Sequence, residues 1–193
     1  MDYQLKETTV LDNIIPKDLQ DKFHDLVMSQ SFKFLKDMSY ADGDIKYPSY
    51  GFNLLFKHPQ HGIMSPLYET VCVPIVNALL EELVLKVNDI YYTRAFLQVP
   101  LADNFYKGQN GAHIDIPDPH YACVYYMNDS DGDTIIYEQN IHDTPPGSKH
   151  IDLVEHKRVT PKKGRIAIFD GARYHCSSQP RENYRCIINF VLV

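Results

Sequence analysis

The sequence has no apolar run approaching the ~20 residues that a membrane-spanning helix requires. It also has no excess of positive charge, because 25 acidic side chains outnumber 19 basic ones and give a formal net charge of −6. General binding of nucleic acids is therefore not expected, since it requires a basic surface. The amino-terminal stretch lacks the pattern of a secretory signal peptide. Together these absences predict a soluble, cytoplasmic protein, and they leave its oligomeric state open.

Cysteine is scarce as well. The four cysteines match neither the spacing of a zinc site nor a disulfide framework, which favours a reducing compartment. They stand in apolar strand-like or helix-like patterns, at Cys72, Cys123, Cys176 and Cys186. With 193 residues, the chain is long enough to form one domain with a substantial core.

Two helical segments are expected in the first part of the chain. Pro16 suits the first turn of a helix, and the apolar residues over 16–30 recur with amphipathic helical spacing. Ser65-Pro66 provides an N-cap and a first helical residue for a longer helix over 66–87. The intervening residues 31–64 mix aromatic residues with glycine and proline, and we expect part strand and part loop there.

From residue 90 onward the chain consists of short runs rich in β-branched and aromatic residues, separated by turn residues. Helices followed by many strands favour a barrel with helices on one face. We therefore expect a single domain over 1–193, in which 1–89 form a helical and irregular support and 90–193 form the mainly β core. The expected strands are 91–99, 121–127, 134–137, 151–156, 165–169, 174–177 and 184–193.

The chain contains two His-x-Asp triplets, and chance alone predicts about one. The first, His113-Ile114-Asp115, precedes His175 by 62 residues, which leaves room for several strands. The second, His150-Ile151-Asp152, ends only 23 residues before His175. We interpret the second triplet as the start of a surface hairpin and the first as the functional one.

The first triplet has the chemistry of a metal site. Because side chains at i and i+2 of an extended segment lie on one face, His113 and Asp115 can hold the same ion. His175 is then expected from a different strand across the barrel. Two histidines and one carboxylate on one face of an octahedron are typical of a non-haem Fe(II) oxygenase. A 2-oxo acid can chelate at two of the open positions and leave the third for dioxygen.

Arg185 is the candidate partner for the far carboxylate of such a co-substrate. It opens the apolar run 184–193, where a buried cation is costly without a partner. Its guanidinium binds carboxylates bidentately and stays charged when buried. The alternative is an arginine that points outward at a strand edge. Arg181, in a turn-like stretch, is a weaker candidate, and the sequence leaves open whether Gln98 or Asn104 lines the site.

Four motifs and one arginine occur in a specific order: Gly-Ala-His-Ile-Asp at 111–115, Ala-Cys-Val-Tyr-Tyr-Met-Asn at 122–128, Asp-Gly-Asp-Thr-Ile-Ile-Tyr at 131–137, Gly-Arg-Ile-Ala-Ile-Phe-Asp-Gly-Ala-Arg-Tyr-His at 164–175, and finally Arg185. Together they resemble the 2-oxoglutarate/Fe(II)-dependent oxygenases, most of all the prolyl-4-hydroxylase-like and bacteriophage-type branches. The resemblance covers about residues 90–193.

This resemblance implies a double-stranded β-helix, or jelly roll, with α-helices flanking a mainly β core. It implies oxidative decarboxylation of 2-oxoglutarate to succinate and CO2, coupled to hydroxylation of a substrate, with ascorbate as an additional cofactor. By the match of motifs, His113, Asp115 and His175 bind iron, and Arg185 holds the C5 carboxylate of 2-oxoglutarate.

The resemblance also assigns roles to two tyrosines. Tyr126 corresponds to a tyrosine that hydrogen-bonds the same carboxylate, and an ordinary core tyrosine is the equally weighted alternative. The neighbouring Tyr125 is expected to face the other way on its strand. Tyr106 lies where relatives place another co-substrate tyrosine, although its spacing from His113 differs. The turn at Gly132-Asp133-Thr134 departs from the usual Gly-Gly-x-Thr form.

Two other classes of function stay open on sequence alone. One is a cupin-like metal enzyme without 2-oxoglutarate, against which Asp115 and Arg185 weigh, and the other is a non-catalytic jelly-roll binding module. The prime substrate is a small molecule or a peptide; peptidyl proline, a free amino acid, another metabolite and a nucleobase all remain open. The long connections 39–51 and 139–149 are either lids over the substrate or ordinary exposed loops.

Overall fold

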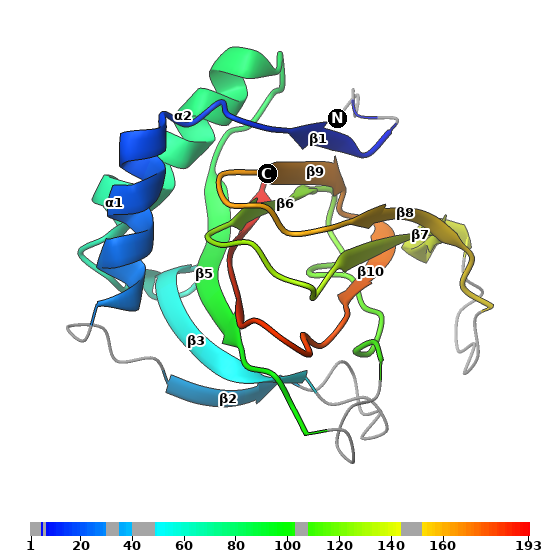
Figure 1. The fold of residues 1–193 in the computed structure, drawn as a ribbon. Helices are drawn as coiled ribbons and strands as arrows, with labels where there is room; N and C mark the ends of the chain where they lie inside the picture. Colours follow the sequence, from blue (N-terminus) through cyan, green and yellow to red (C-terminus); the bar gives the residue numbers. More distant parts are fainter. Residues whose placement is uncertain (1–4, 6, 30–34, 40–48, 103–107, 144–151) are drawn as a thin grey trace.

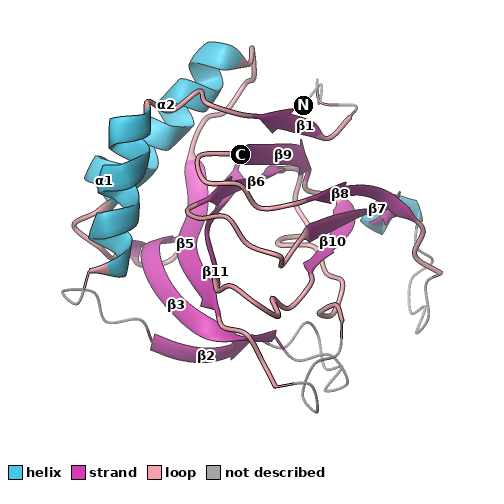
Figure 2. Ribbon diagram, viewed as in Figure 1, coloured by secondary structure: helices cyan, strands magenta, loops and turns pink. Residues whose placement is uncertain are grey.

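The computed structural model describes residues 5, 7–29, 35–39, 49–102, 108–143 and 152–193. Two antiparallel sheets pack face to face, and two helices cover the outer face of the larger sheet (Figures 1 and 2). This is the double-stranded β-helix with flanking helices that the sequence predicted. No helix in these ranges is long and apolar enough to cross a membrane.

The larger sheet has the order β1-β9-β6-β11-β5-β3-β2, with β4 paired to β3, and the smaller has the order β10-β7-β8. The strands of the larger sheet are β1 (Thr9–Leu11), β2 (Leu35–Ser39), β3 (Ser49–His58), β4 (Gly62–Ile63), β5 (Ile90–Gln98), β6 (Tyr121–Tyr126), β9 (Ile166–Asp170) and β11 (Arg185–Leu192). Those of the smaller sheet are β7 (Thr134–Asn140), β8 (Glu155–Val159) and β10 (Arg173–Ser177). A short 3-10 turn, Ile141–Asp143, follows β7.

The two helices are α1 (Lys17–Met28) and α2 (Val73–Glu82), the latter preceded by a π-helical turn over Tyr68–Cys72. The prediction of a helix over 66–87 was therefore too long at both ends. After α2 the chain is extended, and Leu83, Leu85 and Val87 are half-buried while the residues between them are exposed. This period-two burial suits extended chain rather than helix, so tertiary packing overrides the apolar run.

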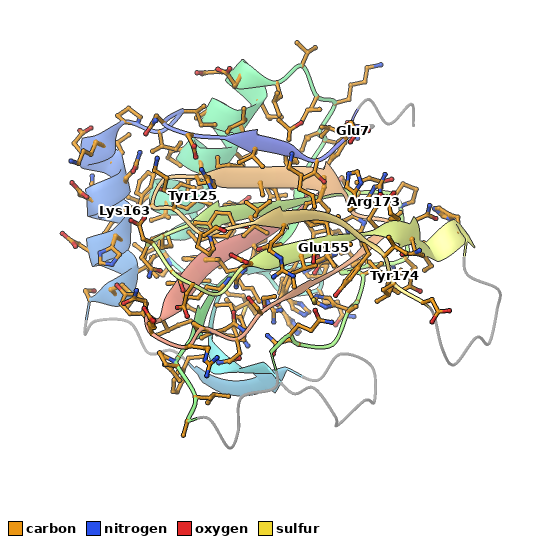
Figure 3. The ribbon with its side chains drawn as sticks, turned by 45° about the vertical axis from the view of Figure 1, so that its right-hand side comes forward. Glu7, Tyr125, Glu155, Lys163, Arg173 and Tyr174 are labelled. Atoms are coloured by element: carbon orange, nitrogen blue, oxygen red, sulfur yellow. The ribbon has the colours of Figure 1, made fainter. Side chains whose placement is uncertain are left out.

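β11 is buried along its whole length, and its two faces differ in character. Cys186, Ile188, Phe190 and Leu192 pack into the core beneath the helices. The alternate residues Arg185, Ile187 and Asn189 face the smaller sheet and line a cavity between the two sheets. β6 repeats this division, because Tyr125, labelled in Figure 3, belongs to the helix-side core and Tyr126 belongs to the core between the sheets, as predicted.

One strand, β8, was predicted at the wrong residues, because its charged side chains obscure the alternation of apolar and polar residues. The expected strand over 151–156 is instead β8, at Glu155–Val159, an edge strand of the smaller sheet with exposed Lys157 and Arg158. Charged side chains are common on edge strands, where they discourage pairing with other chains. The mixed region 31–64 supplies β2, β3 and β4 to the larger sheet. Most of both suggested lids, at 40–48 and 144–149, lies outside the described residues.

Candidate functional site

The first His-x-Asp triplet lies directly beside β10. His113 and His175 form an antiparallel bridge in which each backbone N–H donates to the other's carbonyl at 2.9 Å. His175 does come from a different strand, as predicted, but that strand adjoins the triplet rather than lying across the barrel. Two backbone hydrogen bonds therefore hold the two imidazole rings next to each other, with ring centroids 4.7 Å apart.

The side chains of His113, Asp115 and His175, called the triad below, converge. Nε2 of His113 lies 3.9 Å from Oδ1 of Asp115, and Nε2 of His175 lies 3.6 Å from Oδ2. One ligand atom from each residue falls within 4.8 Å of the other two. No other group of three or more His, Cys, Asp or Glu side chains converges in this way within the described ranges.

The backbone fixes the tautomer of both histidines. Nδ1 of His113 is 3.2 Å from the carbonyl oxygen of Gly111, and Nδ1 of His175 is 3.1 Å from that of Arg173. Because a carbonyl oxygen only accepts, each Nδ1 carries the proton and donates it. Both Nε2 lone pairs are left to face Asp115, as metal coordination requires.

Burial sets the protonation of the triad. It lowers the pKa of His175 to about 4, against the opposing attraction of Asp115. Burial alone would raise the pKa of Asp115, but His175 and His113, with smaller contributions from His120 and Arg94, bring that pKa below its usual range. At neutral pH the site thus presents a neutral His175 and an ionised Asp115, the forms that bind a metal ion without first losing a proton.

Arg185 is buried at the start of β11, with 2% of its surface exposed. Its Nη1 donates to Oε1 of Gln98 and its Nη2 to Oγ1 of Thr134, both at 2.8 Å, while its Nε has no partner. Within the described part of the chain, no carboxylate forms an ion pair with it. A buried guanidinium without an anion is costly, so the geometry favours an anionic ligand here over the outward-facing alternative.

Tyr126 lies beside Arg185, whose guanidinium carbon is 5.9 Å from the centre of the tyrosine ring. Its hydroxyl donates to Oγ1 of Thr134 at 2.7 Å, and burial raises its pKa to about 12, so it stays a neutral donor. Gly132 allows this turn to approach, because a Cβ there would lie 2.9 Å from Cδ of Arg185 and 3.0 Å from the carbonyl oxygen of Ser178.

Two members of the triad, His113 and His175, line the same cavity as Arg185. Its wall includes His113, His175, Thr134, Arg185 and Asn189. Nδ2 of Asn189 lies 3.4 Å from Oδ1 of Asp115, whose other oxygen, Oδ2, is buried without a hydrogen-bond partner. One end of the cavity therefore holds a convergent donor set with an unsatisfied carboxylate oxygen, and the other end holds a cation.

Sequence reasoning missed several residues of the cavity wall. Asn189 was detectable, because it stands four residues after Arg185 in an apolar strand and so shares its face. Thr134 belongs to the motif at 131–137, but the sequence assigned it no role. Arg94 gave no local signal, since its proximity to the triad depends on the pairing of β5 with β11, which places Arg94 opposite Asn189. Gln98, left open by the sequence, contacts Arg185 directly.

The other residues considered from the sequence either lie outside the described part of the chain or belong neither to the triad nor to the cavity wall. Tyr106, Asn104 and His150 lie outside the described residues, so their roles stay predictions. Arg181 lies in the turn before β11, where its backbone N–H donates to Asp131 at 2.7 Å, and it is not part of the cavity wall. The remaining described histidines do not join the triad: His24, His58, His61, His120, His142 and His156.

No protein-family model matches the chain, and no curated protein matches its sequence. Solved structures match over nearly its whole length. A prolyl-4-hydroxylase from Pseudomonas putida has a TM-score of 0.59 at 15% identity, covering 96% of this chain and 91% of that one. An oxidoreductase of the 2OG-Fe(II) oxygenase family from Burkholderia pseudomallei has a TM-score of 0.66 at 13% identity, covering 96% and 84%.

A third match is the non-haem, α-ketoglutarate-dependent epimerase SnoN from nogalamycin biosynthesis, with a TM-score of 0.67 at 9% identity, covering 96% of this chain and 78% of that one. At such low identities these likenesses establish a shared fold. They confirm, at the level of the fold, the resemblance to the 2-oxoglutarate/Fe(II)-dependent oxygenases that the motifs predicted.

Proposed function

We propose that the protein is a 2-oxoglutarate- and Fe(II)-dependent oxygenase that hydroxylates a small-molecule or peptidyl substrate and releases succinate and CO2. One observation carries the proposal: His113 and His175 line the same cavity as a buried arginine without an anionic partner, and Asp115 converges on the two histidines. The structural neighbours support the same class, since they include a prolyl-4-hydroxylase and a 2OG-Fe(II) oxygenase family protein.

The triad fits Fe(II). Two imidazole nitrogens and one carboxylate, all within 4.8 Å of one another, match the two-histidine, one-carboxylate set that leaves positions open on such an ion. The buried Oδ2 of Asp115 has no hydrogen-bond partner, which is explained if it is a ligand atom. With 2-oxoglutarate bound, Fe(II) would supply the activation of dioxygen for oxidation of a substrate C–H bond.

The other residues bind and orient. Arg185 is placed to hold the C5 carboxylate of 2-oxoglutarate through charge-assisted hydrogen bonds. Thr134 accepts from Arg185 and from Tyr126, so its own hydroxyl proton remains available to the same carboxylate. In this proposal Tyr126 acts on the co-substrate through Thr134, and the direct contact that the resemblance implies stays a prediction. Phe96 and Ile187 give the cavity apolar walls that exclude water.

The two alternative functions explain less of the cavity. A cupin-like enzyme without 2-oxoglutarate does not account for the buried positive charge of Arg185, and a non-catalytic binding module does not account for the convergence of the triad. The type of oxidation is less constrained than the co-substrate. The neighbours on this fold include an epimerase and a carbocyclase as well as hydroxylases, and one prolyl hydroxylase, from Trichoplax adhaerens, is in complex with a peptide.

The test is the conversion of 2-oxoglutarate into succinate by the purified protein, with and without added Fe(II). Even without the prime substrate, slow uncoupled turnover that needs Fe(II) is expected. His113→Ala should abolish it, whereas His150→Ala, in the other triplet, should not. Iron-dependent turnover that survives His113→Ala but is lost in His150→Ala would show that the wrong triplet was chosen.

A further inference from the structure

The cavity contains a second arginine to which the proposed reaction gives no role. Arg94 and Phe96 both line the cavity from β5, and the strand register places Arg94 opposite Asn189. The Nε of Arg94 is buried without a hydrogen-bond partner. Among the described residues, none forms an ion pair with its guanidinium. Its positive charge is therefore available to a ligand.

Aromatic rings hold this guanidinium in place. Its central carbon lies 5.4 Å from the centre of the Phe96 ring and 5.9 Å from that of Tyr92. The two rings stand two residues before and after Arg94, on the same face of the strand. Contacts of this kind use none of the N–H groups of a guanidinium, so its hydrogen-bond donors stay available to a ligand. A cation positioned in this way is preorganised for a planar, two-oxygen anion.

Arg94 and Arg185 mark opposite ends of the cavity. Arg185 pairs with Gln98 on β5 and Asn189 pairs with Arg94, so the two arginines are separated by four residues along the sheet, or about 13 Å. The triad lies at the Arg94 end, because Asn189 contacts Asp115. A co-substrate that runs from the triad to Arg185 therefore extends away from Arg94.

The balance of charges in the cavity also indicates that 2-oxoglutarate does not neutralise Arg94. In the proposed complex the two positive charges of Fe(II) and the one of Arg185 are balanced by Asp115 and the two carboxylates of 2-oxoglutarate, with the histidine ligands neutral. Arg94 then leaves one positive charge uncompensated beside the metal, in a partly buried wall where an unpaired charge is costly. One further anion restores the balance.

We propose that Arg94 binds a carboxylate of the prime substrate, so that the enzyme selects acidic organic substrates. This inference rests on the proposed function, because it assigns the metal and Arg185 to 2-oxoglutarate. A carboxylate bound at Arg94 brings neighbouring C–H bonds close to the triad, and a substrate with a neutral amide in its place loses this charge-assisted contact. Arg94 is thus a specificity-determining residue.

The test uses the full chain with Mn(II) in place of Fe(II) and with saturating 2-oxoglutarate, which occupies Arg185. The probes are small carboxylic acids, such as benzoate, phenylacetate and N-acetylated amino acids, each paired with its primary amide. Their binding beside the metal is measured by paramagnetic relaxation of the probe signals in NMR. As a group, the acids should bind about tenfold or more tightly than the amides.

Arg94→Gln should abolish this preference, and Arg94→Lys should keep part of it. The matched control is Arg158→Gln, which removes the same charge from a surface ion pair with Glu155 on β8 and should keep the full preference. The proposal is overturned if amides bind wild type as tightly as acids, or if Arg94→Gln retains the preference. It is also overturned if Arg94→Gln weakens 2-oxoglutarate as much as it weakens the acids. The proposed function fails separately, if 2-oxoglutarate itself does not bind wild type.

Discussion

The two faces of β11 are equally buried but differ in chemistry. On the helix side, Cys186, Ile188, Phe190 and Leu192 pack against α1, α2 and neighbouring strands in the larger core cluster. On the cavity side, the same strand presents Arg185 and Asn189. Burial alone therefore does not reveal which side chains stabilise the fold. The distinction lies in whether their polar atoms find partners inside the protein.

Unsatisfied polar atoms cluster on the cavity side. Oδ2 of Asp115, Nε of Arg94 and Nε of Arg185 are buried there without hydrogen-bond partners, whereas the described residues of the helix-side core contain one such atom, the hydroxyl of Tyr125. Thr8 and His120 each contain one more such atom. Buried polar groups are normally satisfied, so a cluster of exceptions indicates a site that its ligands complete. One face of the strand thus stabilises the fold, and the other is arranged for binding.

The largest effect is expected at the metal end of the cavity. Asp115→Ala removes the carboxylate ligand and should eliminate Fe(II) binding and nearly all Fe(II)-dependent turnover. It should leave the far-ultraviolet circular dichroism unchanged, because the helix-side core is intact. Binding of Fe(II) is measured anaerobically. Wild-type iron affinity in Asp115→Ala would remove Asp115 from the ligand set.

A substitution on the helix-side face of β11 should lower the stability of the protein and leave ligand binding intact. Ile188→Ala deletes fully buried methyl groups from the helix-side core and should lower the free energy of unfolding by about 2–5 kcal/mol, as measured by urea denaturation. Its affinity for 2-oxoglutarate should stay near that of the wild type under conditions where it is folded. A selective loss of affinity with unchanged stability would mean that the two faces are not separate in function.

Two substitutions at Arg185 distinguish the contribution of its charge to 2-oxoglutarate binding from that of its shape. Arg185→Leu should weaken 2-oxoglutarate binding by about 1.5–3 kcal/mol, and Arg185→Lys by less, because lysine keeps the charge but loses the bidentate fork. Iron affinity should change little in both. In the ligand-free protein, Arg185→Leu should be at least as stable as the wild type, since an unpaired buried cation is replaced by an apolar side chain. Calorimetric titration and denaturation measure the two effects.

The smallest effect is expected at an ion pair on the protein surface. Arg165 forms a two-pronged ion pair with Asp12, at 2.8 and 2.9 Å, and the hydrogen bond from Arg165 is the main cause that holds the pKa of Asp12 below its usual range. Asp12→Asn should cost only ~0.2–1 kcal/mol at neutral pH. Because the folded-state pKa is lowered, this contribution is present above the unfolded pKa of about 3.9 and is lost as pH falls through the folded value. Equal stability losses at pH 7 and pH 2 would contradict the assignment.

The sequence predicted the features that depend on motifs and on local patterns of residues. It did not predict features that depend on the pairing of strands distant in the sequence. The motifs and strand runs led to the jelly roll, and the structure brings His113, Asp115 and His175 together as expected. The end of α2 was misplaced, because an extended segment buries the apolar residues that suggested more helix. Arg94 could not be identified from the sequence, because nothing near it reveals that β5 pairs with β11 beside the triad.

The central claim is that the triad and Arg185 bind the two ends of one 2-oxo acid. Anaerobic measurement of 2-oxoglutarate affinity, with and without Fe(II), tests it most directly. Chelation at the metal predicts that Fe(II) raises the affinity of the wild type by about tenfold or more, which corresponds to ~1.4 kcal/mol. Asp115→Ala should lose this gain, and Arg185→Leu should bind 2-oxoglutarate weakly in both conditions. An affinity that is the same with and without Fe(II) would contradict the account.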